Sequence, residues 1–308
     1  MQGGFLERLK KGELMVADGP VHTILEQEQG RPLEGQLGQW IVDNQDKFQA
    51  VVKQTIEAGC DLAHAGTQGN GKYRLDVYKE ELGISSEKEV LDKVYETTFE
   101  ATRLTKEVTP EHCYVMGTIG ISGRFLEPAG DMSFDEAYDS FKEQIIPMID
   151  GGVDVIRIVE NDTEQVVIAI KAAKDLCDLP VIGQNVFYPG KRGIRTLMGV
   201  EVKTATARLA EGGADVIGAV CGDVSPIGDA LDTVKEMREA CDKPLLMKPN
   251  PGMAELINNQ IVWPVTPEEM AEQISDWIDA GASIVGGCCG ASLDHLRLIS
   301  AVVESKKK

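Results

Sequence analysis

The sequence predicts a single-domain α/β protein, a (β/α)8 TIM barrel, and three observations lead to this prediction. The chain has 308 residues, which is the usual length of one such barrel. Eight apolar runs typical of buried strands alternate with eight stretches of helical periodicity. Four joints between a helix and the next strand share one pattern. We therefore expect one domain over residues 1–308, with a doubly wound open sheet as the alternative, because alternation alone does not prove closure.

The four joints identify half of the strands. Each has small residues that suit a helix C-cap, then an acidic or small polar residue, then an apolar run. They cover residues 58–62, 151–155, 212–216 and 280–284. The remaining strands are predicted at 14–17, 114–119, 180–184 and 243–248, and the helices at 43–58, 87–108, 134–150, 163–178, 202–211, 228–240, 267–280 and 293–305. Two long segments, 19–42 and 67–86, follow strand ends and are predicted to be loops that cover a substrate.

Composition excludes several classes of partner. The formal net charge of -19 disfavours nucleic acid and anionic membrane surfaces, both of which attract basic patches. The sequence has no apolar run of about 20 residues, and its start lacks the apolar core of a signal peptide. We expect a cytoplasmic protein with no nucleic-acid or membrane partner.

The positions of the seven cysteines separate them into two groups. Four lie before strands or near helix ends and are predicted to be ordinary small residues: Cys60, Cys113, Cys177 and Cys241. The other three lie at the ends of the sixth and eighth strands: Cys221, Cys288 and Cys289. In a barrel these three should converge on the catalytic rim. A disulfide of the vicinal pair, a redox switch and simple packing are alternatives, but three convergent thiolates favour Zn2+ with its fourth position open.

Several stretches together resemble the homocysteine S-methyltransferase family. They are Gly286-Gly287-Cys288-Cys289-Gly290 with the upstream Cys221, and residues 17–19, 117–120, 195–199 and 248–252, with Glu160 after the fourth strand. The resemblance runs from about Leu14 to Leu298. It implies a (β/α)8 barrel in which the three cysteines bind zinc and homocysteine takes the open position as a thiolate, which then accepts a methyl group to give methionine.

The resemblance also suggests residues that contact the substrate. Glu160 matches the acidic residue that holds the amino group of homocysteine, although it could instead cap the next helix. Asp18 and Gly19 match a motif whose backbone approaches the substrate, and Asn250 lies in a matching stretch. His64 lies where the chain departs from the family, so ligand contact and a structural role are equally open.

The methyl donor is left open by the sequence. The chain ends soon after the eighth helix, so we expect a small methylated compound or a methylcorrinoid on a separate protein. Aromatic residues are only 5% of the chain, which disfavours a quaternary ammonium donor. Departures at Pro20, His64 and Val220 keep a variant open in which methyl groups move between a methylated metabolite and a corrinoid protein. A non-catalytic thiol or zinc redox sensor is the alternative of another class.

Overall fold

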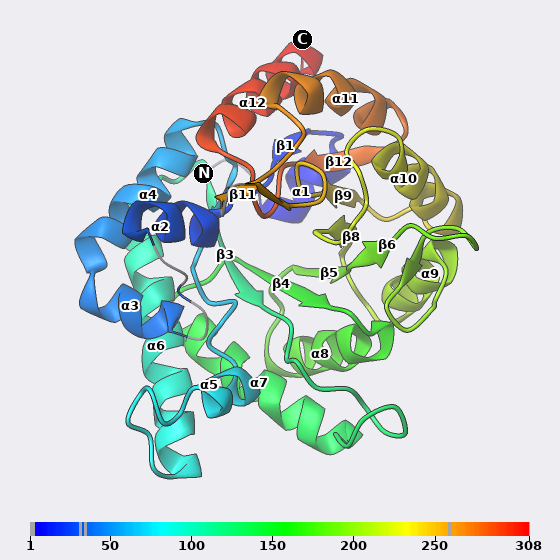
Figure 1. Cartoon of the computed structure of the whole chain (residues 1–308). Coiled ribbons are helices and arrows are strands. Elements are labelled where there is room, and N and C mark those ends of the chain that lie inside the picture. The colour runs from blue at the N-terminus through cyan, green and yellow to red at the C-terminus, as the bar shows by residue number, and fades with distance from the viewer. Residues whose placement is uncertain (1–3, 31–32, 34–35, 258–259, 308) are drawn as a thin grey trace.

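Eight parallel strands form one sheet that curves into a barrel, as Figure 1 shows in a view into its interior. The computed structural model describes residues 4–30, 33, 36–257 and 260–307. The order β1-β12-β9-β8-β5-β4-β3-β2 follows the sequence around the barrel, so the alternative of a doubly wound sheet is wrong. The strands are β1 (Met15–Val16), β2 (Leu62–His64), β3 (Tyr114–Ile119), β4 (Val155–Glu160), β5 (Val181–Asn185), β8 (Val216–Val220), β9 (Leu245–Lys248) and β12 (Ala282–Val285).

The helices surround the strands and bury their apolar faces against them (Figure 1). All eight predicted helices are present, with ends that differ by only a few residues: α4 (Gln45–Glu57), α6 (Glu87–Val108), α7 (Phe134–Asp150), α8 (Thr163–Leu176), α9 (Val202–Glu211), α10 (Asp229–Ala240), α11 (Pro267–Asp279) and α12 (Leu293–Lys306). Their starts are set by local capping. Ser133 and Glu136, for example, form a reciprocal capping box at the start of α7.

Two predictions about loops were wrong. Segment 19–42 contains α2 (Val21–Gln29) and part of α3 (Leu37–Asp43), and segment 67–86 contains α5 (Lys72–Val77). Such short helices carry weak periodicity and are stable only through packing. Here Leu25, Leu37 and Ile41 are buried in one cluster with α4. The other elements outside the prediction are α1 (Phe5–Lys10) and two hairpins, β6 (Phe187–Tyr188) with β7 (Arg195–Thr196) and β10 (Glu255–Ile257) with β11 (Gln260–Val262).

In three of the four repeated joints an aspartate forms a hydrogen bond with the neighbouring strand. Asp61 receives a 2.8 Å hydrogen bond from Val16 N–H, while its own N–H donates to the Val16 carbonyl at 3.0 Å. These two bonds connect β1 to the start of β2 and so complete the circle of strands. Asp154 and Asp215 accept equivalent bonds from Val115 N–H at 2.8 Å and Val181 N–H at 2.9 Å.

The side chains inside the barrel change from apolar to polar along the barrel axis. Its lower layer is apolar and is covered by Phe5 and Leu9 of α1; it contains Met15, Leu62, Met116, Val155, Ile182, Val216, Leu246 and Ile284. The next inward positions on five strands are polar: His64, Thr118, Arg157, Gln184 and Lys248. Cys221, Cys288 and Cys289 lie above this polar layer, just after the ends of β8 and β12. Within the described part of the chain, no helix has the length and apolar character needed to cross a membrane.

Candidate active site

An unusual backbone turn orients the first cysteine. Cys221 directly follows β8 and has φ of 51°, the single positive value among the non-glycine residues that the structure describes. A side chain other than Asn or Asp rarely adopts this conformation, and such positions are concentrated at functional sites. Gly222 continues the turn with φ of 67°. The turn folds the chain back at the end of the strand and exposes the Cys221 sulfur at the barrel rim.

The end of β9 anchors both cysteine-bearing loops. Cys221 N–H donates to the Lys248 carbonyl at 3.1 Å on one side of this strand. On the other side Cys288 N–H donates to the Pro249 carbonyl at 2.8 Å. Because β9 lies between β8 and β12 in the barrel, consecutive carbonyls of one strand fix the relative positions of the two loops.

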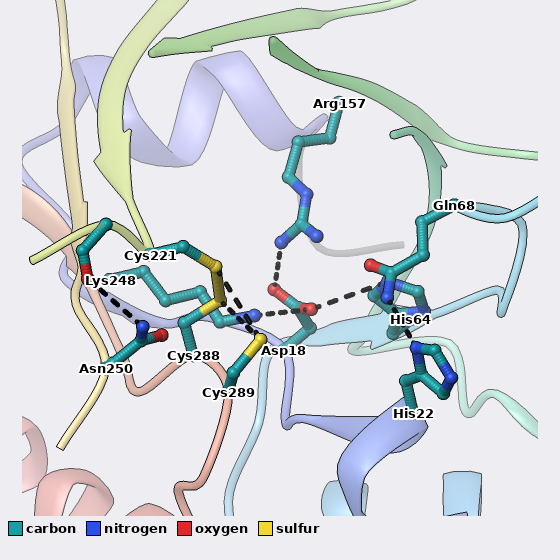
Figure 2. The surroundings of a disulfide bond; sticks show 11 residues. Asp18, His22, His64, Gln68, Arg157, Cys221, Lys248, Asn250, Cys288 and Cys289 are labelled. Carbon is teal, nitrogen blue, oxygen red and sulfur yellow. Dashed lines mark hydrogen bonds and ion pairs between the residues drawn. A yellow bond between two sulfur atoms is a disulfide. The ribbon is translucent and has the colours of Figure 1, made fainter. Parts of the chain in front are cut away.

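The three predicted sulfur atoms come together, with each within 4.8 Å of the others. Cys289 Sγ lies 3.8 Å from Cys221 Sγ and 4.0 Å from Cys288 Sγ (Figure 2). Cys221 and Cys288 are joined as a disulfide, so the alternative of a vicinal disulfide between Cys288 and Cys289 is wrong. Tetrahedral zinc with bonds of about 2.3 Å to sulfur needs sulfurs roughly 3.8 Å apart. The set therefore fits a tetrahedral metal once the disulfide is reduced.

Close packing behind the pair explains its glycine neighbours. Gly290 has φ of 81°, and a side chain on it would collide with the ring of Trp263. A side chain on Gly287 would meet the Ala291 methyl group at 2.7 Å. Ala291 is itself buried. Trp263 and Ala291 thus hold the cysteine loop against the barrel.

A buried ion network lies beside the cysteines, with Asp18 at its centre (Figure 2). Arg157 Nη1 donates to Asp18 Oδ1 at 2.8 Å, and Lys248 Nζ lies 2.7 Å from Asp18 Oδ2. Burial alone would raise the pKa of Asp18, but the charges of Arg157 and Lys248 outweigh it and hold that pKa at about 2. Burial lowers the pKa of Lys248. The Asp18 carboxylate is thus the counter-ion of both Arg157 and Lys248.

His64 belongs to this network as a neutral group. Its Nδ1 accepts a 2.8 Å hydrogen bond from Gly66 N–H, so the ring proton is on Nε2, which lies 4.0 Å from Asp18 Oδ2. Burial lowers the pKa of His64 to about 3. The structure places the imidazole in the polar layer next to Asp18, where it can orient that carboxylate.

Glu160 lies at the end of β4 on the face opposite Arg157. It shares the alternation of Ile156 and Ile158, which pack in the outer core, and pairs in register with Asn185 of β5. Its Oε1 accepts a 2.7 Å hydrogen bond from Ser122 N–H. Burial raises the pKa of Glu160 to about 8. Asp162, not Glu160, caps α8, since its side chain accepts from Glu164 N–H.

Gly19 and Asn250 lie close to the same strand ends. A side chain on Gly19 would meet Thr55 at 2.7 Å, so the close approach of α4 to this turn requires glycine. Asn250 Nδ2 donates to the Gly222 carbonyl at 3.2 Å, and its buried Oδ1 has no partner among the residues that the structure describes. This oxygen is an available acceptor next to the cysteine loops.

Sequence reasoning missed Arg157 and Gln184, and treated Lys248 only as part of a motif. These residues could have been found from the sequence, because each is a polar residue within a largely apolar strand. Arg157 interrupts Val155 to Val159, and a charged residue at an inward position of a buried strand is rarely structural alone. Aromatic side chains near the sulfurs are Tyr188, which packs with Cys221, Cys288 and three valines, and Trp263.

Known proteins resemble this chain along nearly its whole length. The sequence model of the homocysteine S-methyltransferase family matches residues 15–303. Two proteins named methionine synthase, from Mycobacterium leprae and Mycobacterium tuberculosis, are 27% and 25% identical over 94% and 96% of this chain. The chain spans about a quarter of their length, 24% and 25%.

Solved structures show the same fold. The metallated form of the homocysteine methyltransferase MmuM from Escherichia coli matches with a TM-score of 0.75 and 15% identity, covering 96% of this chain and 98% of that one. Its oxidized form matches with a TM-score of 0.73 and 14% identity over 95% and 97%. The fold is that of a TIM-barrel methyltransferase, and the family match extends across the barrel and all three cysteines. The chain belongs to the homocysteine S-methyltransferase family of enzymes.

Proposed function

We propose that residues 1–308 form a zinc-dependent methyltransferase domain that binds homocysteine as a thiolate and methylates it to methionine. The observation that carries this proposal is the convergence of Cys221, Cys288 and Cys289 at the end of the barrel where such enzymes place their active sites. The separations of Cys289 Sγ from the other two sulfurs suit tetrahedral zinc, and three protein ligands leave one position open. All three thiols must be reduced and deprotonated to bind it.

Bound zinc would supply the positive charge that lowers the pKa of a substrate thiol and keeps it ionised at neutral pH. The protein's own residues would orient the substrate. Glu160 would hold the amino group, since a carboxylate that is buried and largely protonated becomes favourable as an anion when an ammonium group approaches. Asn250 Oδ1 and the backbone at Gly19 are further contacts at the strand ends.

In the reaction the acceptor sulfur would attack the methyl carbon, and the donor would leave with the electron pair of the broken bond. Val159, Val186 and Val220 form an apolar wall around Cys288, which would limit water at the reacting sulfur. A small methylated compound or a methylcorrinoid on a separate protein would supply the methyl group.

Measurement of zinc content and methyl transfer tests the proposal. Cys221→Ser, Cys288→Ser and Cys289→Ser should each lose bound zinc and methyl transfer from a panel of donors that includes methylcobalamin. Cys241→Ser is the matched control, because this thiol lies at the far end of α10 and should change neither. Retained transfer in Cys221→Ser without zinc would overturn the mechanism.

The Cys221 to Cys288 disulfide favours one second candidate, a thiol redox sensor. Such a sensor would oxidise and reduce reversibly without turnover. Thiol titration of the protein in the presence of each methyl donor separates the two functions, because only an enzyme forms methylated product in proportion to the reduced, zinc-bound fraction.

A further inference from the structure

The loop after β3 carries the backbone N–H that contacts Glu160. Residues 120–125 of this loop belong to no helix or strand. Ser122 N–H nevertheless points at Glu160 Oε1 and donates to it at 2.7 Å. The chain turns sharply at the next residue, because Gly123 has φ of 79°, in the left-handed region. Since no ladder of backbone bonds fixes the direction of this N–H, contacts from side chains must do so.

Gln165 holds this turn at two points. It is the third residue of α8 and is 1% exposed. Its Nε2 donates to the Arg124 carbonyl at 2.8 Å, and because a carbonyl only accepts, this bond sets the orientation of the amide. Its Oε1 therefore faces the Ser122 hydroxyl, which donates to it at 3.1 Å. Arg124 N–H donates to Ser122 Oγ at 3.3 Å, so the three residues form a closed ring of hydrogen bonds.

The ring connects the loop after β3 to the turn after β4. Glu160 ends β4, and Gln165 lies in the first turn of the next helix, so the carboxylate and the amide belong to one βα turn. Asp162 fixes that turn by capping α8, since it accepts from Glu164 N–H at 3.0 Å. The position of Ser122 N–H relative to the Glu160 carboxylate is therefore controlled by Gln165.

The rest of the loop is held independently of Gln165. The Arg124 guanidinium pairs with Asp131 at 2.7 Å and lies over the ring of Tyr73 in α5, 4.8 Å from its centroid. Leu126 and Met132 form a β-bridge farther along the loop. Loss of the Gln165 amide should thus free the direction of Ser122 N–H without unfolding the loop.

We propose that Gln165 is a positioning residue that, through Ser122, orients Glu160 toward the amino group of the acceptor thiol. The proposal rests on the proposed function, which gives this contact to Glu160. Gln165 itself touches no substrate, because it is buried and both ends of its amide are used by Ser122 and Arg124. With Oε1 held by Ser122, the carboxylate keeps one orientation in which its remaining lone pairs can accept from an ammonium group.

Two ligands that differ only in the amino group test the proposal. The zinc-loaded protein is titrated calorimetrically with homocysteine and with 4-mercaptobutanoate, which lacks that group. Wild type should bind homocysteine about 10-fold more tightly or better, as expected for a charge-assisted hydrogen bond in a buried site. Gln165→Met keeps the length of the side chain but makes neither hydrogen bond. It should lower this preference about fivefold, while the affinity for 4-mercaptobutanoate stays the same.

Gln144→Met is the matched control. Gln144 of α7 is also buried, but its Nε2 donates at 2.7 Å to the carbonyl of Thr67, in the loop after β2. The control should lose similar stability and keep the full preference for homocysteine. An unchanged preference in Gln165→Met, or an equal loss of affinity for both ligands, would overturn the proposal. Ser122→Ala removes the hydroxyl and keeps the N–H, so it must also lower the preference, and it decides the question if Gln165→Met does not fold.

Titration of Glu160 separates this proposal from the proposed function. It is followed by 13C NMR of labelled glutamate carboxyl groups, with Glu160→Gln to assign the signal, and it needs neither zinc nor substrate. The Ser122 N–H bond favours the ionised form, so Gln165→Met should raise the pKa of Glu160 and Gln144→Met should not. Asp162, whose charge also acts on this pKa, is present in every variant.

The two measurements have distinct outcomes. An unchanged pKa of Glu160 in Gln165→Met would overturn the positioning role. A raised pKa, in a protein whose wild type binds both ligands equally, would support that role and contradict the contact of Glu160 with the amino group.

Discussion

Replacement of Asp18 by asparagine should destabilise the barrel strongly, and in a manner that depends on pH. The side chain keeps its size but loses its charge, so Arg157 and Lys248 would face each other in a buried site without a counter-ion. Removal of one partner from a buried ion pair costs about 3–5 kcal/mol, more than an exposed pair is worth. We expect a loss of this size in the free energy of unfolding at pH 7.

The pH dependence follows from the pKa of Asp18, which is about 2 in the folded protein against an ordinary value of 3.8. Because the folded value is the lower one, the carboxylate stabilises the protein above pH 4, and this contribution disappears as the pH falls through 2. Its full size is about 2.5 kcal/mol, of which about 1 kcal/mol should be gone at pH 3. The difference between wild type and Asp18→Asn should shrink by that amount.

Urea unfolding followed by Trp fluorescence measures both effects, since Trp277 is fully buried. Asp131→Asn is the control: Asp131 pairs with Arg124 at the surface and should change stability by less than about 1 kcal/mol. The double variant Asp18→Asn with Arg157→Gln should recover part of the loss because one cation is removed. A loss below about 1 kcal/mol for Asp18→Asn, or one that is constant from pH 7 to pH 3, would refute the counter-ion role.

Three further substitutions test other parts of the molecule. The pKa of Glu160, about 8 when folded against 4.5, favours the folded state at low pH, and this stabilisation is lost as the pH rises through 8. The stability of the wild type should therefore fall by about 3.5 kcal/mol between pH 5 and pH 8 because of this group, and urea unfolding should show that Glu160→Gln removes this fall. The same fall in wild type and variant would contradict the raised pKa. Gly290→Ala should lose about 1–3 kcal/mol and bind zinc more weakly in chelator competition, because φ is 81° and Trp263 occupies the space. Asp61→Ala should lose about 1–3 kcal/mol in thermal or urea unfolding by leaving Val16 N–H without its acceptor, whereas Asp61→Asn should recover most of that loss.

The repeated joints made the fold predictable, and the structure gives the reason. Three of the four joints contain an aspartate, and each of them (Asp61, Asp154 and Asp215) accepts a backbone hydrogen bond from the preceding strand. One residue type therefore recurs because one contact recurs. The short helices α2 and α5 have no such repeated contact, and their stability comes from packing that no local pattern encodes.

The cysteines were predictable because each lies at a strand end, and parallel strands in a barrel share one rim. The pairing of Cys221 with Cys288 was not, since the sequence favoured three zinc-binding thiolates, and the disulfide considered as an alternative joined Cys288 to Cys289. The partners of Asp18 could not be predicted from the sequence either. Arg157 lies 139 residues away in the chain, and only the closed barrel brings the two side chains together.

The polar layer depends on glycines as much as on its charged residues. Gly218 of β8 leaves room for Gln184 of β5, and Gly286 after β12 lies 3.6 Å from Lys248 Cγ of β9, measured to the position a Cβ would take. Long polar side chains can lie across a narrow barrel only if the neighbouring strand contributes almost no volume. Gly218 and Gly286 lie three and two residues before Cys221 and Cys288 in the chain. Residues that shape the cysteine cluster and residues that shape the polar layer are therefore close neighbours at the ends of the same two strands, so a change in either should alter the geometry of the other.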